Sequence, residues 1–410
     1  MKINYKYKDK EFDDIRNIVY NSKLEINYDY IFEEYLPFQA FISKRTFFKD
    51  VTINPSIEFD PFEYVKFEEF NKDLFSKYIQ EYLTRYEFDY SKEFANAVSG
   101  GIDSSIIALE TKPKIIYSGF FKEKEFNEIP YSTEIAKKIK ANHYKYELNE
   151  LDFLRNMEEC IEILCSPIGG LGSVAEYTTL KKILKDVPSI KQVIFGNGGD
   201  EIFMGYFFNY YIKEFYNKSC IKPKYMPNFL PFKKELSNKI IDFMIVASLN
   251  RGYPSALYSS FVKNTFISKI NKIESIIDKL LFININITLP TLLHINNQIC
   301  KSTKIKGFNP LANKDLIRIS KYINTPISKI PKESLRTLYE DMPKKIKNNY
   351  IKRGFPIPTH KWDTFNNVVK NAYNSFFKRK EVTIEKMSYN GINRYTWGIF
   401  QAELCLRRFK

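Results

Sequence analysis

Hydrophobic and polar positions along residues 86–217 predict strands and helices in alternation. Short β-prone apolar runs are expected to form strands, and they occupy residues 94–98, 114–120, 143–148 and 191–196. Between them, residues 128–140 and 151–164 carry apolar side chains at helical spacing. Strands that alternate with helices in this way are typical of a parallel sheet. We therefore expect an α/β fold with a doubly wound, mainly parallel sheet.

The pattern changes on both sides of this region. Residues 64–85 have helix-like apolar spacing, and beyond residue 217 the apolar runs lengthen and glycines become few. Residues 282–288 alternate as a strand would, but their helical surroundings favour a helix. We predict three parts: a small N-terminal region at 1–75, a sheet domain at 76–217 and a mostly helical part at 218–410.

The first predicted strand runs into a glycine turn and then into a helix. Adjacent glycines let the backbone turn sharply and approach a ligand, and the free N–H groups of a helix start favour anions. A lone Gly-Gly pair is usually only a turn, but this one directly follows a strand and precedes small hydroxyls. The candidate phosphate-binding residues are Ser99, Gly100, Gly101, Asp103, Ser104 and Ser105.

Asp103 indicates a metal ion rather than a direct phosphate contact. A carboxylate beside a polyphosphate is repelled unless a divalent cation lies between them, so we expect Asp103 to bind Mg²⁺. The stretch also lacks the Gly-Lys-Ser/Thr ending of a Walker loop, which argues against transfer of a γ-phosphate.

Two motifs resemble one enzyme family. The stretch Ser-Gly-Gly-Ile-Asp-Ser-Ser at 99–105 is similar to the pyrophosphate loop of the N-type ATP pyrophosphatases, which cleave ATP between the α- and β-phosphates. Further along, residues 193–206 resemble the second signature of asparagine synthetase-like enzymes, and weaker landmarks follow, such as Lys-Glu-Ser-Leu-Arg at 332–336. The chain is identified as a member of that family, with residues 76–217 as its ATP-pyrophosphatase domain.

This resemblance assigns roles to residues at the strand ends. It implies that the nucleotide is ATP and that Ser118 and Gly196 line the adenosine. It also implies that Asp200 joins Asp103 as a Mg²⁺ ligand. The alternative is that Asp200 and Glu201 are acids favoured at the start of a helix.

Lys352 matches the family lysine that neutralises charge on the phosphoryl group, because it precedes a Gly-Phe pair at the family spacing. Positive charge placed in advance where negative charge develops is the most effective stabilisation available to this reaction. The alternative is a solvated surface lysine, since the stretch 344–353 is basic. The resemblance thus makes Lys352, Asp200 and Asp103 the candidate catalytic residues.

Several charged positions of the family pattern are replaced in this chain. The replacements are Asn197, Asn297, Lys306, Phe308, Asn313 and Tyr350. Acids are lost from the substrate side, while the ATP side is kept. A small dicarboxylate would be poorly paired in such a pocket, so we expect a small-molecule, peptide or sugar carboxylate other than, or besides, aspartate.

The N-terminal region resembles the segment that joins the two halves of full-length asparagine synthetases, over residues 35–55. In those enzymes the preceding half is a glutaminase whose nucleophile is a cysteine directly after the initiator methionine. Here position 2 is Lys2 and the first cysteine is Cys160. We expect the glutaminase to be absent or reduced to a remnant. Nitrogen would then come from free ammonia, a separate glutaminase or an amine of the substrate.

Composition disfavours some classes of binding partner. The net charge of +15 allows a nucleic-acid partner, but the lysines are scattered along the chain, so RNA is a minor alternative. Five cysteines and three histidines show no paired metal-ligand spacing, which disfavours zinc. Because neither a run of about eighteen apolar residues nor a signal peptide is visible, we expect a cytoplasmic protein without a membrane partner.

One reaction would use the ATP, the Mg²⁺ and the carboxylate acceptor together. A carboxylate does not react with an amine at neutral pH, but its attack on the α-phosphate of ATP gives an acyl-adenylate and pyrophosphate, and an amine then displaces AMP. We predict an ATP-dependent, AMP-forming carbon-nitrogen ligase or amidotransferase. Peptide- or lactam-cyclising synthetases are alternatives with the same chemistry. An RNA-modifying ATP pyrophosphatase and a non-catalytic scaffold subunit are alternatives of other classes.

Overall fold

The computed structural model describes residues 4–54, 69–206, 208–209, 212, 245, 249 and 260–410, except 168, 325–329 and 351–356. Lys352 and nearly all of 213–259 therefore lie outside the described residues. The boundaries predicted at 75 and 217 stay predictions.

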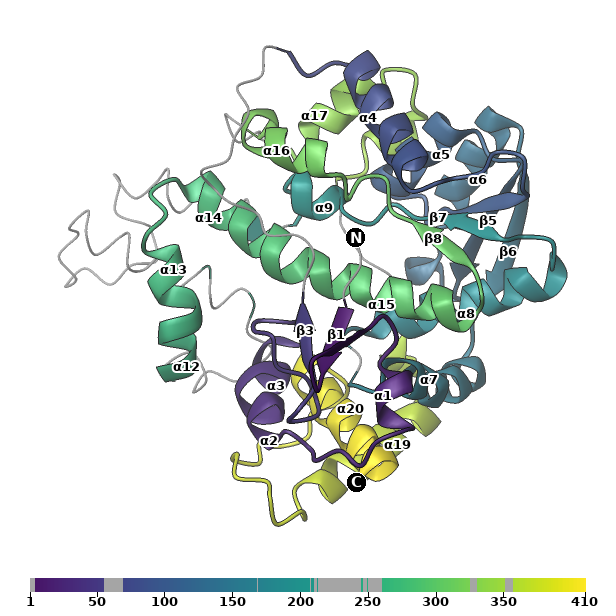
Figure 1. Cartoon of the computed structure of the whole chain (residues 1–410). Helices are drawn as coiled ribbons and strands as arrows, with labels where there is room; N and C mark the ends of the chain where they lie inside the picture. Colours follow the sequence, from purple (N-terminus) through teal and green to yellow (C-terminus); the bar gives the residue numbers. More distant parts are fainter. Residues whose placement is uncertain are drawn as a thin grey trace, which may run out of the picture.

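Five parallel strands form the central sheet, in the order β6-β5-β4-β7-β8. Their bounds are β4 Phe94–Ala97, β5 Ile115–Phe120, β6 Asn142–Glu147, β7 Gln192–Ile194 and β8 Lys306–Phe308. The chain starts at β4, moves outward to β5 and β6, and then returns to β7 on the other side of β4 (Figure 1). This reversal makes the carboxyl ends of β4 and β7 the switch point at which such sheets bind ligands. The predicted doubly wound parallel sheet is confirmed.

Strand β8 lies in the part of the chain for which the sequence predicts mostly helix. It is three residues long and pairs with β7 through a register that places Gly307 opposite Val193. So short an edge strand carries no periodicity of its own, and only its tertiary pairing with β7 defines it.

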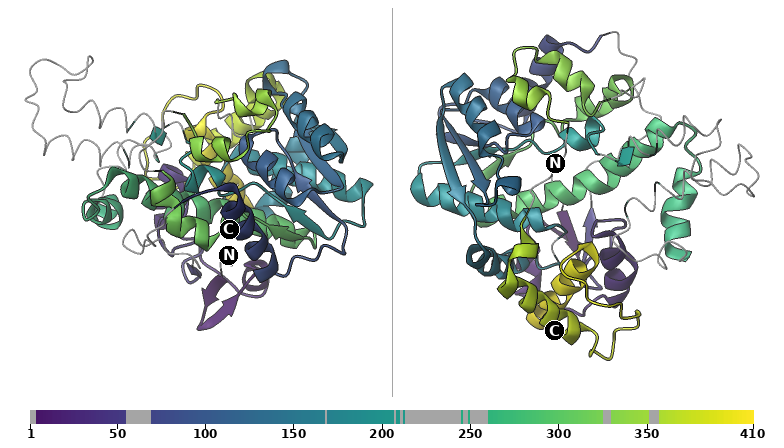
Figure 2. Two further views of the ribbon diagram at one scale, coloured as in Figure 1. Left: turned by 90° about the horizontal axis from the view of Figure 1, so that it is seen from above. Right: turned by 180° about the vertical axis from the view of Figure 1, so that it is seen from behind.

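Helices cover both faces of the sheet (Figures 1 and 2). They are α5 Ile102–Thr111, α6 Ile129–Ile139, α7 Glu150–Leu164 and α8 Leu171–Asp186. Tyr117 and Val193 point into the core that holds α7 and α8, whereas Ile116 and Ile194 point into the core that holds α5 and α6. Successive side chains of a strand face opposite sides, so the short strands β5 and β7 each supply both cores.

The C-terminal half is mostly helical among the described residues, as predicted. Its elements are α12 Ser260–Val262, η4 Lys263–Ile267, α13 Ser268–Ile270, α14 Ile276–Ile283, η5 Asn284–Thr288, α15 Leu289–Ser302, α16 Lys314–Ile323, α17 Glu333–Leu338, α18 Lys344–Lys347, η6 Thr359–Lys361, α19 Asp363–Phe376 and α20 Arg394–Phe409. Residues 282–288, whose alternation suggested a strand, are helical because they continue α14 through the π-helical turn η5 into α15.

The continuous helix at Ile276–Ser302 is long and apolar enough, by length and composition, to cross a membrane. However, 72% of its most apolar window is buried inside the protein. Burial against protein on most sides is the behaviour of a core helix, and α15 fills that role beside α7 and α8 (Figure 1).

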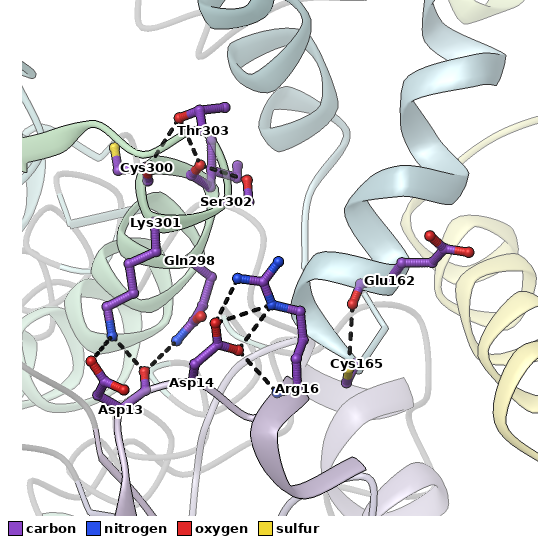
Figure 3. Close-up of polar contacts among 11 residues, drawn as sticks. Asp13, Asp14, Arg16, Glu162, Cys165, Gln298, Cys300, Lys301, Ser302 and Thr303 are labelled. Atoms are coloured by element: carbon purple, nitrogen blue, oxygen red, sulfur yellow. Dashed lines mark hydrogen bonds and ion pairs between the residues drawn. The ribbon is translucent and has the colours of Figure 1, made fainter. Parts of the chain in front are cut away.

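The N-terminal region docks on the same core. Its sheet has the antiparallel order β2-β1-β3, and its elements are β1 Asn4–Tyr7, β2 Lys10–Phe12, α1 Arg16–Val19, α2 Tyr28–Tyr30, η1 Ile31–Tyr35, α3 Leu36–Phe38 and β3 Thr52–Asn54. Lys301 and Gln298 of α15 donate to the Asp13 carbonyl (Figure 3). The C-terminal helices α19 and α20 lie beside this region (Figure 2). Helix α4, Lys72–Arg85, then leads into β4, within the predicted helical segment.

A buried hydrogen bond joins the N-terminal sheet to α15, because the Tyr5 hydroxyl lies 2.8 Å from His294 Nε2. We predict that Tyr5→Phe lowers the free energy of unfolding by about 1–3 kcal/mol, since it leaves a buried ring nitrogen unpaired. Urea unfolding measures the loss. The matched control is Tyr20→Phe at a residue that is 54% exposed, which should change stability by less than about 0.5 kcal/mol. Equal effects at the two positions would contradict the docking role.

Burial lowers the pKa of His294 to about 3. An unfolded histidine binds its proton near pH 6.5, so between these values only the unfolded chain is protonated. The contribution of the neutral His294 ring to the free energy of unfolding is therefore complete above pH 6.5. Below pH 6.5 it falls by about 1.4 kcal/mol for each pH unit. We predict that His294→Gln loses less stability than the parent protein between about pH 6.5 and 5. Urea unfolding at several pH values measures this loss. If the free energy of unfolding falls equally for the two proteins between pH 6.5 and 5, His294 does not titrate in this way.

Candidate active site

The Ser99–Ser105 loop connects β4 to α5 at the switch point of the sheet. Gly100 has φ +88°, and a Cβ there would lie 2.5 Å from Tyr131 Cβ and 2.9 Å from Ser132 N. Glycine is therefore needed both for the left-handed backbone and for close packing against α6. The turn delivers the backbone to the start of α5, whose free N–H groups favour an anion.

The predicted phosphate ligands lie together in one turn but differ in exposure, since Gly100 is buried and Ser104 is 8% exposed. Ser104 Oγ lies 3.2 Å from both the Ser99 amide and Ser99 Oγ, and Gly101 N donates to Ser99 Oγ at 3.2 Å. Ser99 and Gly101 are exposed, so both can reach a ligand. Ser105 is fully buried, and its hydroxyl has no partner in the part of the chain that the structure describes. Its role as a phosphate ligand stays a prediction.

The second motif packs directly on the first. A Cβ on Gly196 would lie 2.7 Å from Ser104 N, and one on Gly199 would lie 2.3 Å from Asp103 Cγ. Gly198 has φ +103° and closes the turn into α9, Gly199–Ile202. Glycines are thus required where the chain after β7 touches the loop after β4, and they bring Asp200 beside Asp103.

Two acids and a lysine form the charged centre of this site. Lys332 Nζ lies 2.6 Å from Asp200 Oδ1 and forms a second ion pair with Asp103. The side chains are nearly closed off from water, at 5% exposure for Lys332, 13% for Asp103 and 9% for Asp200. Gly205 makes room for this group, because a Cβ there would meet both Lys332 and Asp200. A single cation therefore joins two carboxylates that would otherwise repel each other.

The acids fit the expected metal ion. Among the described residues no group of three or more His, Cys, Asp or Glu side chains converges, so these residues offer a metal ion this pair of carboxylates. Mg²⁺ is commonly held by one or two carboxylates, with substrate phosphates and water as its other ligands. Asp103 and Asp200, beside the phosphate loop, are the residues that would hold it.

Lys332 is a site residue whose role sequence reasoning missed. It stands just before α17, in a stretch recognised only as a landmark. Arg336 of α17 donates to the Pro331 carbonyl at 2.8 Å and to the Asn349 carbonyl at 2.9 Å, which fixes the turn that carries Lys332. Lys352, the predicted catalytic lysine, lies outside the described residues.

Ser118 has its hydroxyl occupied within the sheet. It donates to the Val98 carbonyl at 2.5 Å and lies 2.9 Å from His143 Nε2. Burial lowers the pKa of His143 to about 4, so the ring is neutral at physiological pH. Ser118 lies within β5 rather than at its end, and its predicted contact with adenosine stays a prediction. Gly196 is partly exposed at the end of β7.

The replaced charges have structural uses. Phe308 is buried against Phe88, with ring centroids 5.0 Å apart. Asn313 accepts from Asp315 N at the start of α16 and donates to the Tyr78 carbonyl at 2.7 Å. Lys306 lines a depression of about 610 Å³ that opens at the amino ends of β4, β7 and β8, the edge opposite the phosphate loop. None of the three supplies an acid to the site.

We predict that Gly199→Ala weakens MgATP binding by about tenfold to a hundredfold, because the added Cβ displaces Asp103 from the loop. Isothermal titration calorimetry measures the affinity. The matched control is Gly170→Ala, at a position where nothing lies within 4 Å of an added Cβ. Unchanged affinity in Gly199→Ala would remove Asp103 from the nucleotide site.

Comparisons with known proteins assign the chain to a family. Residues 91–397 match the asparagine synthase family. A search among curated proteins finds no match. Among solved structures, an NMN synthetase from Francisella tularensis is similar over 57% of this chain and 95% of its own, with 15% identity and a TM-score of 0.26. Since the family match covers well over half of the chain, the protein belongs to the asparagine synthase family.

Proposed function

We propose that the protein forms amide bonds by activating a carboxylate with ATP. The carboxylate attacks the α-phosphate, which gives an acyl-adenylate and pyrophosphate, and ammonia or an amine then displaces AMP. Family membership supports ATP-dependent amide ligation. The observation that carries the AMP-forming reaction is the convergence of Asp103, Asp200 and Lys332 beside the phosphate loop. Negative charge develops on the pyrophosphate as it separates from AMP. The lysine can stabilise that charge directly, and the two carboxylates can do so by holding a metal ion.

Each residue has a distinct task in this proposal. The N–H groups at the start of α5, with Ser99 and Ser104, hold the phosphate chain. Asp103 and Asp200 hold Mg²⁺, which when bound neutralises charge on the departing pyrophosphate. Lys332 supplies a fixed positive charge at the same point. Because these side chains are nearly buried, their electrostatic interactions are stronger than in water.

Other parts of the proposal rest on the sequence alone. Lys352 is the further candidate for neutralising the phosphoryl group during adenylation. The acceptor is a carboxylate other than, or besides, aspartate. The nitrogen is ammonia, which a separate glutaminase would supply, or an amine. We also propose a cytoplasmic protein that works without a nucleic-acid or membrane partner.

Two alternatives differ in what they need from the site. A scaffold subunit has no use for two nearly buried carboxylates that require a counter-ion, because such groups cost stability when they are taken out of water. A peptide- or lactam-cyclising synthetase uses the same activation, but its amine belongs to the substrate. Its product is lighter than the substrate by one water and forms without added ammonia, which mass spectrometry distinguishes.

The experiment that tests the proposal incubates the protein with MgATP, ammonia and a panel of acids. The panel contains aspartate, uronic acids and acidic peptides, and both pyrophosphate and AMP are followed. Release of both products that depends on one acid supports adenylation and names the acceptor class. Release of ADP, or no turnover with any acid, contradicts it.

We predict that Lys332→Met lowers acid-dependent pyrophosphate release by about a hundredfold or more, since it removes a preorganised charge from the reacting phosphates. The matched control is Lys345→Met at an exposed position, which should keep its activity. Circular dichroism verifies that both variants are folded. If Lys332→Met does not fold, Lys332→Arg keeps the charge but not the geometry and should still be impaired. Full activity in either Lys332 variant would show that this lysine is only a structural counter-ion.

A further inference from the structure

A row of four hydrogen-bonded side chains runs from the second motif into the protein core. Asn197 Nδ2 donates to Asn309 Oδ1 at 2.9 Å, and Asn309 Nδ2 donates to Asn296 Oδ1 at 2.9 Å. Asn296 Nδ2 then donates to Glu176 Oε1 at 2.6 Å. The residues come from the turn after β7, the turn after β8, α15 and α8. Every bond has the same direction, and the row ends on a carboxylate, which accepts. We call these residues the amide row.

The middle of the amide row is closed to water, with exposures of 1% for Asn296 and 3% for Asn309. An unpaired amide at such a position would cost about 1–3 kcal/mol, so each link holds the next in one orientation. Glu176 is partly buried, and desolvation raises the pKa of its carboxyl, while the bond from Asn296 acts in the opposite direction. The row therefore has a fixed polarity from Asn197 to Glu176.

The other end of the row lies at the site. Asn197 is partly exposed, and its amide nitrogen is engaged by Asn309, so its amide oxygen points away from the row. Across the described residues, no group donates to that oxygen. Asn197 also stands next to Gly196, where an added Cβ would lie 2.7 Å from the Ser104 amide nitrogen of the phosphate loop. An amide oxygen only accepts hydrogen bonds, so it suits a donor such as the N–H of an amine.

We propose that Glu176, Asn296 and Asn309 are positioning residues that hold the Asn197 amide oxygen toward the reacting carbonyl, where it accepts a hydrogen bond from the amine nucleophile. This inference rests on the proposed amide-forming function. In the second half-reaction the amine nitrogen forms a C–N bond with the adenylate carbonyl. The bond between that carbon and the AMP oxygen breaks, AMP leaves with the electron pair, and a proton passes from nitrogen to water.

The row acts on the second half-reaction only. A neutral amide at position 197 orients the nitrogen lone pair but does not take its proton, whereas adenylation involves no amine at all. Disrupting the row should therefore impair capture of the adenylate more than its formation. A buried residue with only a structural role would weaken both half-reactions together.

The test measures the two half-reactions separately in the full-length protein. ATP–pyrophosphate exchange with the preferred acid reports adenylation, and hydroxamate formation with hydroxylamine reports capture by an amine. We expect Asn309→Ala to lower kcat/KM for hydroxylamine by about tenfold while exchange changes by less than about twofold, as for loss of one oriented hydrogen bond. Glu176→Ala should behave alike. Glu176→Gln should restore capture, because its amide oxygen still accepts from Asn296.

The matched control is Asn156→Ala, another buried amide beside α8. Asn156 Nδ2 donates to Thr178 Oγ1 at 3.0 Å, and none of its bonds reaches the row. Asn156→Ala should change ATP–pyrophosphate exchange and hydroxamate formation to the same extent. If Asn309→Ala does not fold, Asn197→Ala at a partly exposed position carries the same comparison.

Equal loss in both half-reactions for the row variants, or failure of Glu176→Gln to restore capture, overturns the inference and leaves the proposed function intact. Absence of exchange with every acid in the parent protein overturns the proposed function, and the inference with it.

Discussion

Two carboxylates share one cation at the switch point of the sheet, and the site depends on that arrangement. Asp103 and Asp200 both pair with Lys332, and the three side chains are at most 13% exposed. Nearly buried acids placed this close need a positive charge between them. The requirement joins α5, α9 and the turn before α17, which are far apart in sequence, and it leaves no room for a side chain at Gly199 or Gly205.

The same arrangement links packing to the proposed chemistry. Glycine contacts between the two motifs set how closely the acids approach the phosphate loop, and the loop itself needs Gly100 to turn against α6. Two described positions at which the family pattern carries charge are neutral here, since Phe308 is part of the core and Asn313 caps a helix. The end of the amide row at Asn197, where we propose that the amine binds, is neutral as well. The proposal of an acceptor other than, or besides, aspartate rests on these neutral positions.

Local patterns in the sequence predict much of this structure. Four strands, their order of appearance and the helices α6 and α7 follow from periodicity, and the phosphate loop with the start of α5 follows from its glycines and its place after a strand, whereas α8 is not predicted. Features created by tertiary contact do not follow. Strand β8 exists only because it pairs with β7. Lys332 belongs to the site because Arg336 anchors its turn, and nothing in the spacing of the sequence reveals that. Similarly, the hydroxyl of Ser118 is engaged by the Val98 carbonyl after β4 and by His143 of β6.

Oxygen transfer from the acceptor to AMP is the measurement that tests the central claim most directly. If a carboxylate attacks the α-phosphate, an acid labelled with ¹⁸O in its carboxyl group must leave one labelled oxygen in AMP when the amide forms. The account predicts that ³¹P NMR shows this label in AMP and that pyrophosphate stays unlabelled. Label in inorganic phosphate, together with ADP, would show activation at the γ-phosphate and contradict the role assigned to the loop and its two acids.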